Sequence, residues 1–341
     1  MACWRGCDKR VIMRNLITDV AGVRVGHADD AALASGVTVI VFDSAVVGSV
    51  DVRGGGPGTR ETALLDPAQT VEGVDAIVLS GGSAFGLDAA SGVQARMREQ
   101  GRGFRIGNAV VPIVPGAIMF DMLNGGDKGW GRYPPYRELG YAAAANASTD
   151  VALGSVGAGL GATTATLKGG VGSASGRTRG GITVGAIVVV NAVGTVTVGD
   201  GPHFWAAPFE QNGEFGGRGV APQVSAADLA IRAKGGPQEN TTIGLVVTDA
   251  QLNKAQTNRL AVMAQDGLAR AIYPVHTPLD GDVLFAAATG AVDLPDPYYG
   301  LAEVGMVAGN VMARAVARAI YEAKALPFPG ALPSWKDRFG G

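Results

Sequence analysis

The stretch Gln238-Glu-Asn-Thr-Thr-Ile-Gly-Leu-Val-Val-Thr-Asp-Ala250 joins a polar turn to an apolar run that predicts a buried strand. Thr241 lies at the entrance of that strand, where a hydroxyl is well placed to become a nucleophile. A threonine hydroxyl is not ionised near neutral pH and needs an adjacent base. Cleavage between Asn240 and Thr241 would supply one, because a free α-amino group has a pKa of about 8. The alternative is an ordinary turn before a strand.

Composition limits the possible classes of protein. The chain has 341 residues, of which 47% are hydrophobic and 17% charged, so it can bury a large core. A formal net charge of -2 argues against nucleic-acid binding, which favours a basic face. No apolar run reaches the roughly eighteen residues that a membrane helix needs. We therefore expect a cytoplasmic protein that binds neither nucleic acid nor membrane.

The first residues and the histidines give no sign of a metal site. Cys3 and Cys7 form a CxxxC pair without a nearby histidine, and we expect residues 1–14 to be a dispensable tail before a single catalytic domain at 15–341. The chain has three histidines, and none shows the spacing of metal ligands. The run at 157–161 lacks the spacing of a dinucleotide fingerprint. We expect neither metal nor cofactor.

Apolar patterns and turn residues predict strands that alternate with helices, which indicates an α/β fold. The strands are expected at 23–25, 37–41, 76–79, 183–190, 194–198, from 241 onward, and at 283–287. The helices are expected at 84–100, 226–233, 253–271 and 301–324. The last four elements form a β-α-β-α unit that could stay associated after a break before Thr241.

Four polar residues near strand ends are candidates for the chemistry. Lys168 stands among glycines, where it would be only partly solvated, and Asn191 ends a predicted buried strand. Its amide could donate to an oxyanion. Asp280 and Asp282 precede a strand and could orient an ammonium or balance Lys168. The alternatives are an exposed turn lysine, a turn asparagine and a solvated Asx turn.

Several motifs together resemble the P1 peptidase family (family S58, DmpA-type), which includes L-aminopeptidase/D-esterases, β-aminopeptidases and endo-type nylon-oligomer hydrolases. The resemblance covers about residues 15 to 325. Besides the opening stretch, the motifs are Asn15-Leu-Ile-Thr-Asp-Val-Ala-Gly-Val-Arg-Val-Gly-His27, Asp51-Val-Arg-Gly-Gly-Gly-Pro-Gly-Thr-Arg-Glu-Thr62, Leu79-Ser-Gly-Gly-Ser-Ala-Phe-Gly-Leu87, Lys168-Gly-Gly-Val-Gly-Ser-Ala-Ser175 and His276-Thr-Pro-Leu-Asp-Gly-Asp282.

The resemblance implies an αββα sandwich, a fold shared with ornithine acetyltransferase, and a precursor that cleaves itself into chains 1–240 and 241–341. Thr241 would then be the nucleophile of an amide hydrolase, with its own α-amine as base. Lys168 and Asn191 would stabilise developing charge, and Asp280 and Asp282 would orient groups in the site. Family members commonly form homotetramers of the cleaved pair, and we expect the same here.

The substrate is expected to be a peptide or another small linear amide. Ser83, in a glycine-rich turn whose amides could face a pocket, and Phe120 are predicted to line it. Many family members have tyrosine where this chain has Phe120, so a hydrogen bond from that position is not expected. Three alternatives remain: an endo-acting 6-aminohexanoate (nylon) oligomer hydrolase, an acyltransferase of the ornithine acetyltransferase type, and a non-catalytic binding protein.

Overall fold

The computed structural model describes residues 13–232, 234 and 240–340. Most of the tail predicted at 1–14 and the residues just before Asn240 lie outside this range. The described elements are β1 Val23–Asp30, β2 Ser35–Val52, β3 Gly58–Arg60, β4 Gly73–Ser80, α1 Ala89–Glu99, β5 Phe104–Ile106, β6 Ala109–Val111, β7 Gly116–Ile118, α2 Tyr136–Ala145, β8 Gly170–Arg177, β9 Thr183–Asn191, β10 Thr241–Ala250, α3 Lys254–Ala271, β11 Val283–Val292, α4 Tyr299–Tyr321 and α5 Trp335–Phe339.

The long strand β2 connects two groups of strands into one hydrogen-bonded network. Among the described residues the order is β3-β7-β4-β2-β11-β10-β9-β8, with β1 paired to β2. An irregularity between Val41 and Val46 interrupts the pairing of β2 with β4. The half before it pairs with β1, and the half after it pairs with β11. At this irregularity β2 passes from one group of strands to the other, so a single strand is hydrogen-bonded in both groups.

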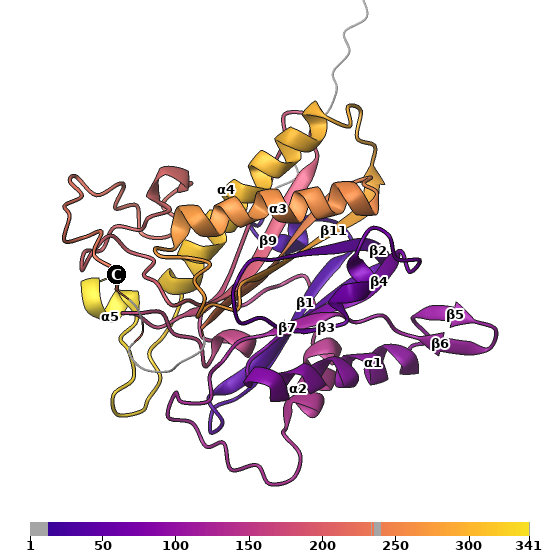
Figure 1. Ribbon diagram of the computed structural model, residues 1–341, viewed down its shortest axis with the longest axis horizontal. Coiled ribbons are helices and arrows are strands. Elements are labelled where there is room, and N and C mark those ends of the chain that lie inside the picture. Colours follow the sequence, from indigo (N-terminus) through magenta and orange to yellow (C-terminus); the bar gives the residue numbers. More distant parts are fainter. Residues whose placement is uncertain (1–12, 233, 235–239, 341) are drawn as a thin grey trace, which may run out of the picture.

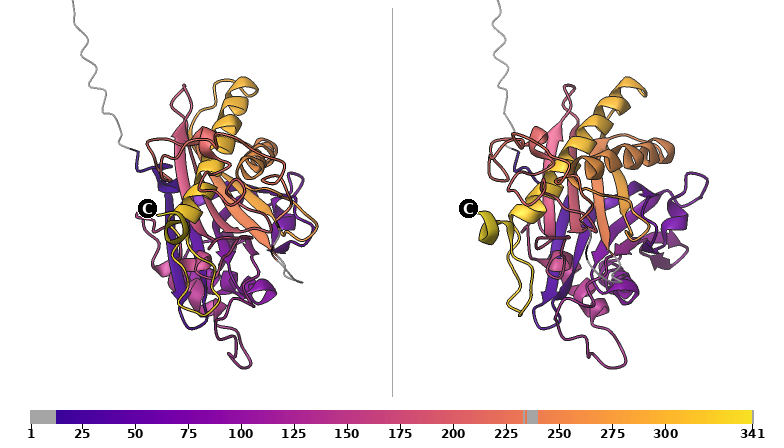
Figure 2. Two further views of the ribbon diagram at one scale, coloured as in Figure 1. Left: turned by 90° about the vertical axis from the view of Figure 1, so that its left-hand side faces the viewer. Right: turned by 60° about the vertical axis from the view of Figure 1, so that its left-hand side comes forward.

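Three apolar clusters show that these groups stack as layers. One cluster lies between α3 and α4 and the strands β8 to β11. A second fills the space between those strands and the group around β1, β2 and β4. A third lies between that group and the helices α1 and α2. The two helix pairs accordingly cover opposite outer faces, which confirms the predicted αββα sandwich (Figures 1 and 2).

Strands β9 and β10 are buried on both sides, as the middle of such a sandwich requires. In β9, Val188 and Val190 contact the helix-side cluster, whereas Ile187 and Val189 contact the central one. All ten residues of β10 are buried. A central strand with apolar residues on both faces fixes its own position tightly, and so it holds Thr241 at its first residue.

Helix α3 begins at Lys254, where Asn253 and Gln256 form a capping box. The Asn253 side chain accepts a hydrogen bond from Gln256 N at 2.9 Å, and the Gln256 side chain accepts one from Asn253 N at 3.0 Å. Its buried face packs on α4, where a Cβ at Gly267 would lie 2.5 Å from Gly309 O, so the helices cross closely. The expected β-α-β-α unit is therefore present as β10, α3, β11 and α4.

Two predicted elements are wrong. Residues 194–198 form only isolated bridges, to Tyr273 and Phe204, and not a strand of the sheet. In the described part of the helix predicted at 226–233, residues 226–229 form a turn and no helix follows. Asp228 accepts hydrogen bonds from Ser225 N and Ser225 Oγ at 2.9 and 2.7 Å, as in a capping box, but the residues after it are mostly exposed, so no buried face stabilises further helical turns. The helix expected from residue 84 begins at Ala89, after a 3-10 turn. Helix α2 was not predicted.

Candidate active site

Thr241 is the first residue of β10 and is buried, with 3% of its surface exposed. It lies opposite Asn191 in the antiparallel pairing with β9. Its hydroxyl donates a hydrogen bond to the carbonyl oxygen of Asn240 at 2.5 Å. The same oxygen accepts a hydrogen bond from Gly281 N at 2.7 Å. The nucleophile candidate is thus turned toward the carbonyl of the peptide bond before it.

Both aspartates at the entrance of β11 lie beside this bond, each with 1% of its surface exposed. Asp282 accepts hydrogen bonds from Thr242 N at 2.7 Å and from His276 through its backbone N at 3.1 Å, and its carboxylate lies 2.8 Å from His276 Nδ1. Asp280 accepts from Val193 N at 3.1 Å and from the Thr277 hydroxyl at 2.8 Å. The alternative of a solvated turn is wrong, because both carboxylates are buried.

The electrostatics of the aspartate pair are not symmetrical. Burial raises the pKa of Asp280, and the nearby negative charge of Asp282 raises it further. The hydrogen bonds from Thr277 and Val193 oppose this shift. Asp280 is therefore the carboxylate that takes up a proton more readily than an ordinary aspartate as the pH falls.

Lys168 is almost completely buried, so the alternative of an exposed turn lysine is wrong. Its ammonium donates hydrogen bonds to three carbonyl oxygens, those of Gly159, Ala162 and Gly169, at 2.8 to 2.9 Å. Burial lowers its pKa to about 7, and the charge of Lys234 lowers it too. It is a buried cation near its point of neutralisation at physiological pH.

Asn191 connects Thr241 to a second lysine, the half-buried Lys234, which the sequence analysis missed. Its Oδ1 accepts hydrogen bonds from Thr163 N and from Lys234 Nζ, each at 3.0 Å. Its Nδ2 donates to Phe120 O at 3.0 Å. Burial lowers the pKa of Lys234 to about 7 as well, although Asp280 and Asp121 raise it. Nothing in the sequence around Lys234 distinguishes it from an exposed lysine.

A cavity of about 320 Å³ is lined by Lys168 and Lys234, whereas Thr241 and Asn191 are not among its lining residues in the described part of the chain. Its charged lining consists of Lys168, Lys234 and Asp121, and its apolar lining includes Phe120 and Leu332. Phe120 therefore lies where a pocket residue was predicted. Ser83, the other predicted pocket residue, is not among the described residues that line this cavity. Its backbone N–H donates a hydrogen bond to Met119 O at 3.0 Å.

Asp121 is a further site residue that was missed. Its carboxylate accepts hydrogen bonds from the Ser35 hydroxyl at 2.6 Å and from Gly82 N at 2.8 Å. Burial raises its pKa, whereas the charge of Lys128 lowers it. The sequence offered one signal for Asp121, which is that it directly follows Phe120, a predicted pocket residue.

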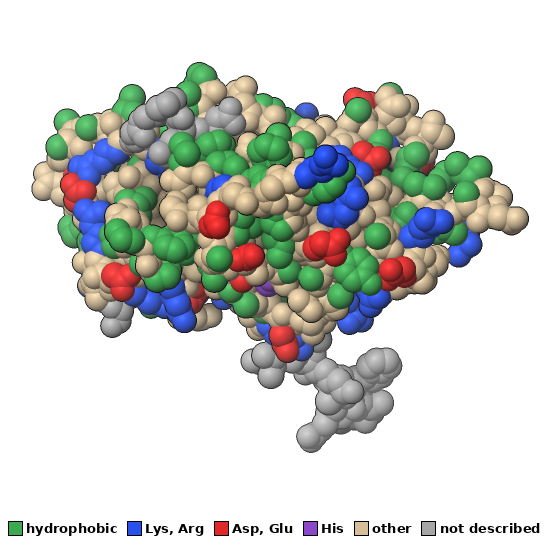
Figure 3. Space-filling model, turned by 90° about the horizontal axis from the view of Figure 1, so that it is seen from below, with side chains coloured by type: hydrophobic (Ala, Val, Ile, Leu, Met, Phe, Trp, Pro, Cys, Tyr) green, Lys and Arg blue, Asp and Glu red, His purple; other side chains and the backbone are tan. Residues whose placement is uncertain are grey.

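Within the ranges that the structure describes, no three His, Cys, Asp or Glu side chains gather as metal ligands would. No helix of that part of the chain has the length and hydrophobicity that a membrane crossing requires. On the face drawn in Figure 3, Lys and Arg side chains are interspersed with Asp and Glu. The expectations about metals and nucleic acid stay predictions.

The fold is shared with solved structures that include a variant of the N-terminal-nucleophile hydrolase fold. The L-aminopeptidase D-Ala-esterase/amidase of Ochrobactrum anthropi, described as a variant of that fold, matches with a TM-score of 0.68 over 95% of this chain and 91% of that chain, at 20% identity. A β-aminopeptidase of Burkholderia sp. matches with a TM-score of 0.68 over the same shares, at 24% identity.

More particularly, the chain belongs to peptidase family S58, whose model matches residues 15–330. An uncharacterized aminopeptidase of Mycobacterium tuberculosis is 46% identical over 96% of this chain and 98% of that protein. A 6-aminohexanoate-oligomer endohydrolase of Agromyces sp. is 30% identical over 81% of this chain and 76% of that protein. The predicted family is confirmed, and the chain is an amide-bond hydrolase of this family.

Proposed function

We propose that the chain cleaves its own Asn240–Thr241 bond and then hydrolyses amide bonds with Thr241 as an N-terminal nucleophile. The observation that carries this proposal is the 2.5 Å hydrogen bond from the Thr241 hydroxyl to the Asn240 carbonyl oxygen. A hydroxyl held against the carbonyl of its own peptide bond needs little movement to attack it. Cleavage would produce chains 1–240 and 241–341.

The freed α-amine of Thr241 supplies the base that the intact chain lacks. In each turnover Thr241 Oγ1 attacks the substrate carbonyl, the amine takes the hydroxyl proton and passes it to the leaving amine, and water hydrolyses the resulting ester. Asp282 holds Thr242 N, which fixes the backbone next to the nucleophile. Lys168 and Asn191 are the groups that we propose to stabilise charge, Asn191 from its position opposite Thr241 in the pairing of β9 with β10 and Lys168 from the cavity lining.

The cavity supports a linear amide or a peptide as substrate, because its lining contains both charged and apolar side chains. Aminopeptidase action on a substrate with a free amine is the leading proposal, with Asp121 as the carboxylate that faces the ammonium. Endo-acting cleavage of aliphatic oligoamides is the second. Phe120 favours it, since this side chain makes the cavity wall less polar than a tyrosine would.

Denaturing electrophoresis of the purified protein tests the proposal. Two chains of roughly 24 and 10 kDa are expected, by apportioning the 34.5 kDa total according to residue number, and the smaller should begin with Thr241. Thr241→Ala should remain one chain and lose activity. Thr242→Val is the matched control, because Thr242 is the buried neighbour whose hydroxyl has no hydrogen-bond partner among the described residues. An active protein with an intact 240–241 bond would refute the proposal.

Turnover without any acyl acceptor other than water separates hydrolysis from acyl transfer, and an inert intact chain would support the non-catalytic alternative.

We also propose the homotetramer of cleaved pairs that the family resemblance implies, which light scattering after size-exclusion chromatography tests. The cytoplasmic location stays a prediction from the sequence.

A further inference from the structure

The carbonyl oxygen of Asn240 is held from two sides. Besides the Thr241 hydroxyl, the backbone N–H of Gly281 donates to it at 2.7 Å. The chain also returns a hydrogen bond from Asn240 N to Leu279 O at 3.1 Å. This short pairing of residue 240 with the 279–281 segment continues the parallel arrangement of β10 and β11 past the end of the sheet.

The Gly281 N–H is fixed in place by its neighbours. Asp280 and Asp282 flank it, and both carboxylates are anchored by the contacts described above. From the other side, Gly56 N donates to Asp280 O at 2.8 Å. Donors that are held in position before charge develops stabilise that charge best.

Residue 281 has no room for a side chain. A Cβ there would lie 2.6 Å from Gly56 O and 2.8 Å from Thr241 Oγ1. Glycine thus lets the backbone of residue 281 approach both the nucleophile and the bond before it. This close approach is a local reason for the sequence Asp280-Gly281-Asp282.

We propose that the backbone N–H of Gly281 is the oxyanion donor of the self-cleavage reaction, an inference that rests on the proposed self-processing. Thr241 Oγ1 forms a bond to the carbonyl carbon of Asn240, and the carbonyl electron pair moves onto Asn240 O. The carbon–nitrogen bond then breaks while the hydroxyl proton passes to Thr241 N, which becomes the free amine. Water finally hydrolyses the ester to the Asn240 carboxylate and the Thr241 hydroxyl.

The hydrogen bond from Thr241 Oγ1 cannot remain during this step, because that oxygen gives up its proton as it attacks. The Gly281 N–H keeps its proton throughout and so stays directed at the growing negative charge. The two groups first expected to stabilise charge are engaged elsewhere in the intact chain: Lys168 donates to three other carbonyls, and Asn191 Nδ2 donates to Phe120 O.

Replacing one amide by an ester tests the proposal, since an ester removes the N–H and adds no side chain at a position that has no room for one. The full-length chain is made by cell-free translation with glycolic acid at position 281, and cleavage is followed over time by mass spectrometry. The matched control carries glycolic acid at position 56, which removes the neighbouring hydrogen bond to Asp280 O without touching Asn240 O. The 281 ester should cleave on the order of 100-fold more slowly than the 56 ester.

Equal cleavage rates of the two esters, with an unmodified chain that cleaves, overturn the proposal and leave self-processing intact. An unmodified chain that never cleaves removes self-processing and this proposal with it. If the 281 ester does not fold, the uncleavable Thr241→Ala chain decides by nuclear magnetic resonance. A coupling across the hydrogen bond between Gly281 N and the Asn240 carbonyl carbon supports the proposal, and its absence overturns it.

Discussion

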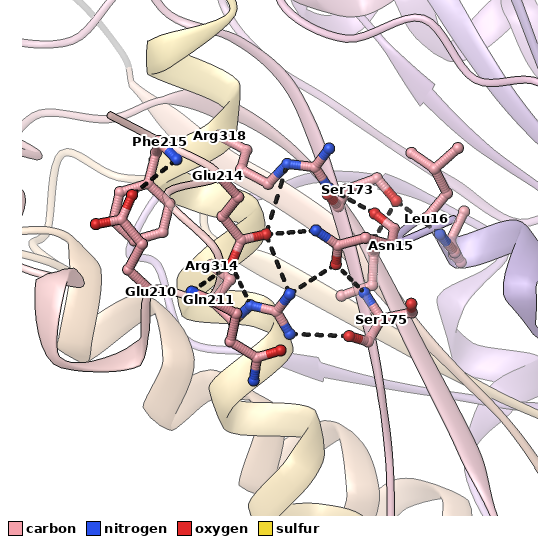
Figure 4. A network of polar contacts seen from close by, with 12 residues as sticks. Asn15, Leu16, Ser173, Ser175, Glu210, Gln211, Glu214, Phe215, Arg314 and Arg318 are labelled. Carbon is pink, nitrogen blue, oxygen red and sulfur yellow. Dashed lines mark hydrogen bonds and ion pairs between the residues drawn. The ribbon is translucent and has the colours of Figure 1, made fainter. Parts of the chain in front are cut away.

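Glu214 and Arg314 form an ion pair at 2.5 Å, and each side chain is more than nine-tenths buried. Arg314 also donates to Asn15 Oδ1 at 2.7 Å and to Ser175 O at 2.8 Å. Arg318 joins the same group from the next turn of α4 (Figure 4). Both arginines follow the Asn240–Thr241 bond in the chain, whereas their partners precede it. The network therefore joins the two chains that cleavage would produce.

We predict that this network keeps the cleaved chains together. Glu214→Gln should still self-cleave, but its two chains should separate at a lower urea concentration than those of the parent. The reason is that two buried guanidinium groups lose their counter-charge, which typically costs about 3 to 5 kcal/mol. Size-exclusion chromatography in increasing urea measures the separation.

The control is an exposed ion pair that joins the same two chains. Arg338 contacts Asp200 at 3.1 Å, with the side chains 31% and 62% exposed. Arg338→Gln should hardly change the urea concentration at which the two chains separate, because exposed ion pairs contribute about 0 to 1 kcal/mol. Equal shifts in Glu214→Gln and Arg338→Gln would show that burial of the network contributes nothing.

A second prediction concerns the buried charge of Lys168. Its pKa is about 7 in the folded chain, against 10.5 for an ordinary lysine. Between these values the unfolded chain binds the proton and the folded chain does not, so the free energy of unfolding rises with pH over this window. Below about pH 7 both states are protonated, and the full penalty of burying the charge is present.

Lys168→Met should therefore flatten the rise of stability between about pH 7 and 10. Chemical denaturation at several pH values measures this effect. Lys234→Met is the matched variant, since the pKa of Lys234 is also lowered to about 7 but its ammonium donates to the Asn191 side chain, whereas that of Lys168 donates to three backbone carbonyls. If the free energy of unfolding rises with pH as steeply in Lys168→Met as in the parent, then the Lys168 ammonium is exposed to solvent and not buried.

Several strands and helices could be predicted because they follow from apolar periodicity, as α3 and β9 show. The layered sandwich and the roles expected for Asp280 and Asp282 came from the resemblance to the family. One predicted helix failed although Ser225 and Asp228 make the contacts of a capping box, because the residues that follow are mostly exposed and bury no apolar face.

Site residues were missed where burial comes from chain crossings that sequence patterns do not show. Lys234 lies in a polar glycine-rich segment, yet its ammonium donates a hydrogen bond to Asn191 Oδ1, which is 43 residues away in the chain. The Gly281 N–H is a backbone group, and no side-chain pattern reports where such a group points. Asp121 acquires its burial from Ser35 and from the turn at Gly82.

The last prediction follows from the use of an α-amine as base. Such an amine accepts a proton only when neutral, so turnover of a cleaved enzyme should rise with pH through the amine's pKa, which is ordinarily about 8. Lys168 and Lys234 lose most of their charge above about pH 7, and Asp121, whose pKa burial raises, is the acidic group on the cavity lining among the described residues. A substrate ammonium beside this carboxyl group would favour its charged form. A free aliphatic oligoamide should thus be cleaved at least about tenfold faster than its N-acetylated form, as the loss of one charged contact implies. Rates of both substrates at several pH values test the two halves separately. A rate independent of pH would exclude the amine base, and equal rates for the two substrates would replace aminopeptidase action by endo-cleavage.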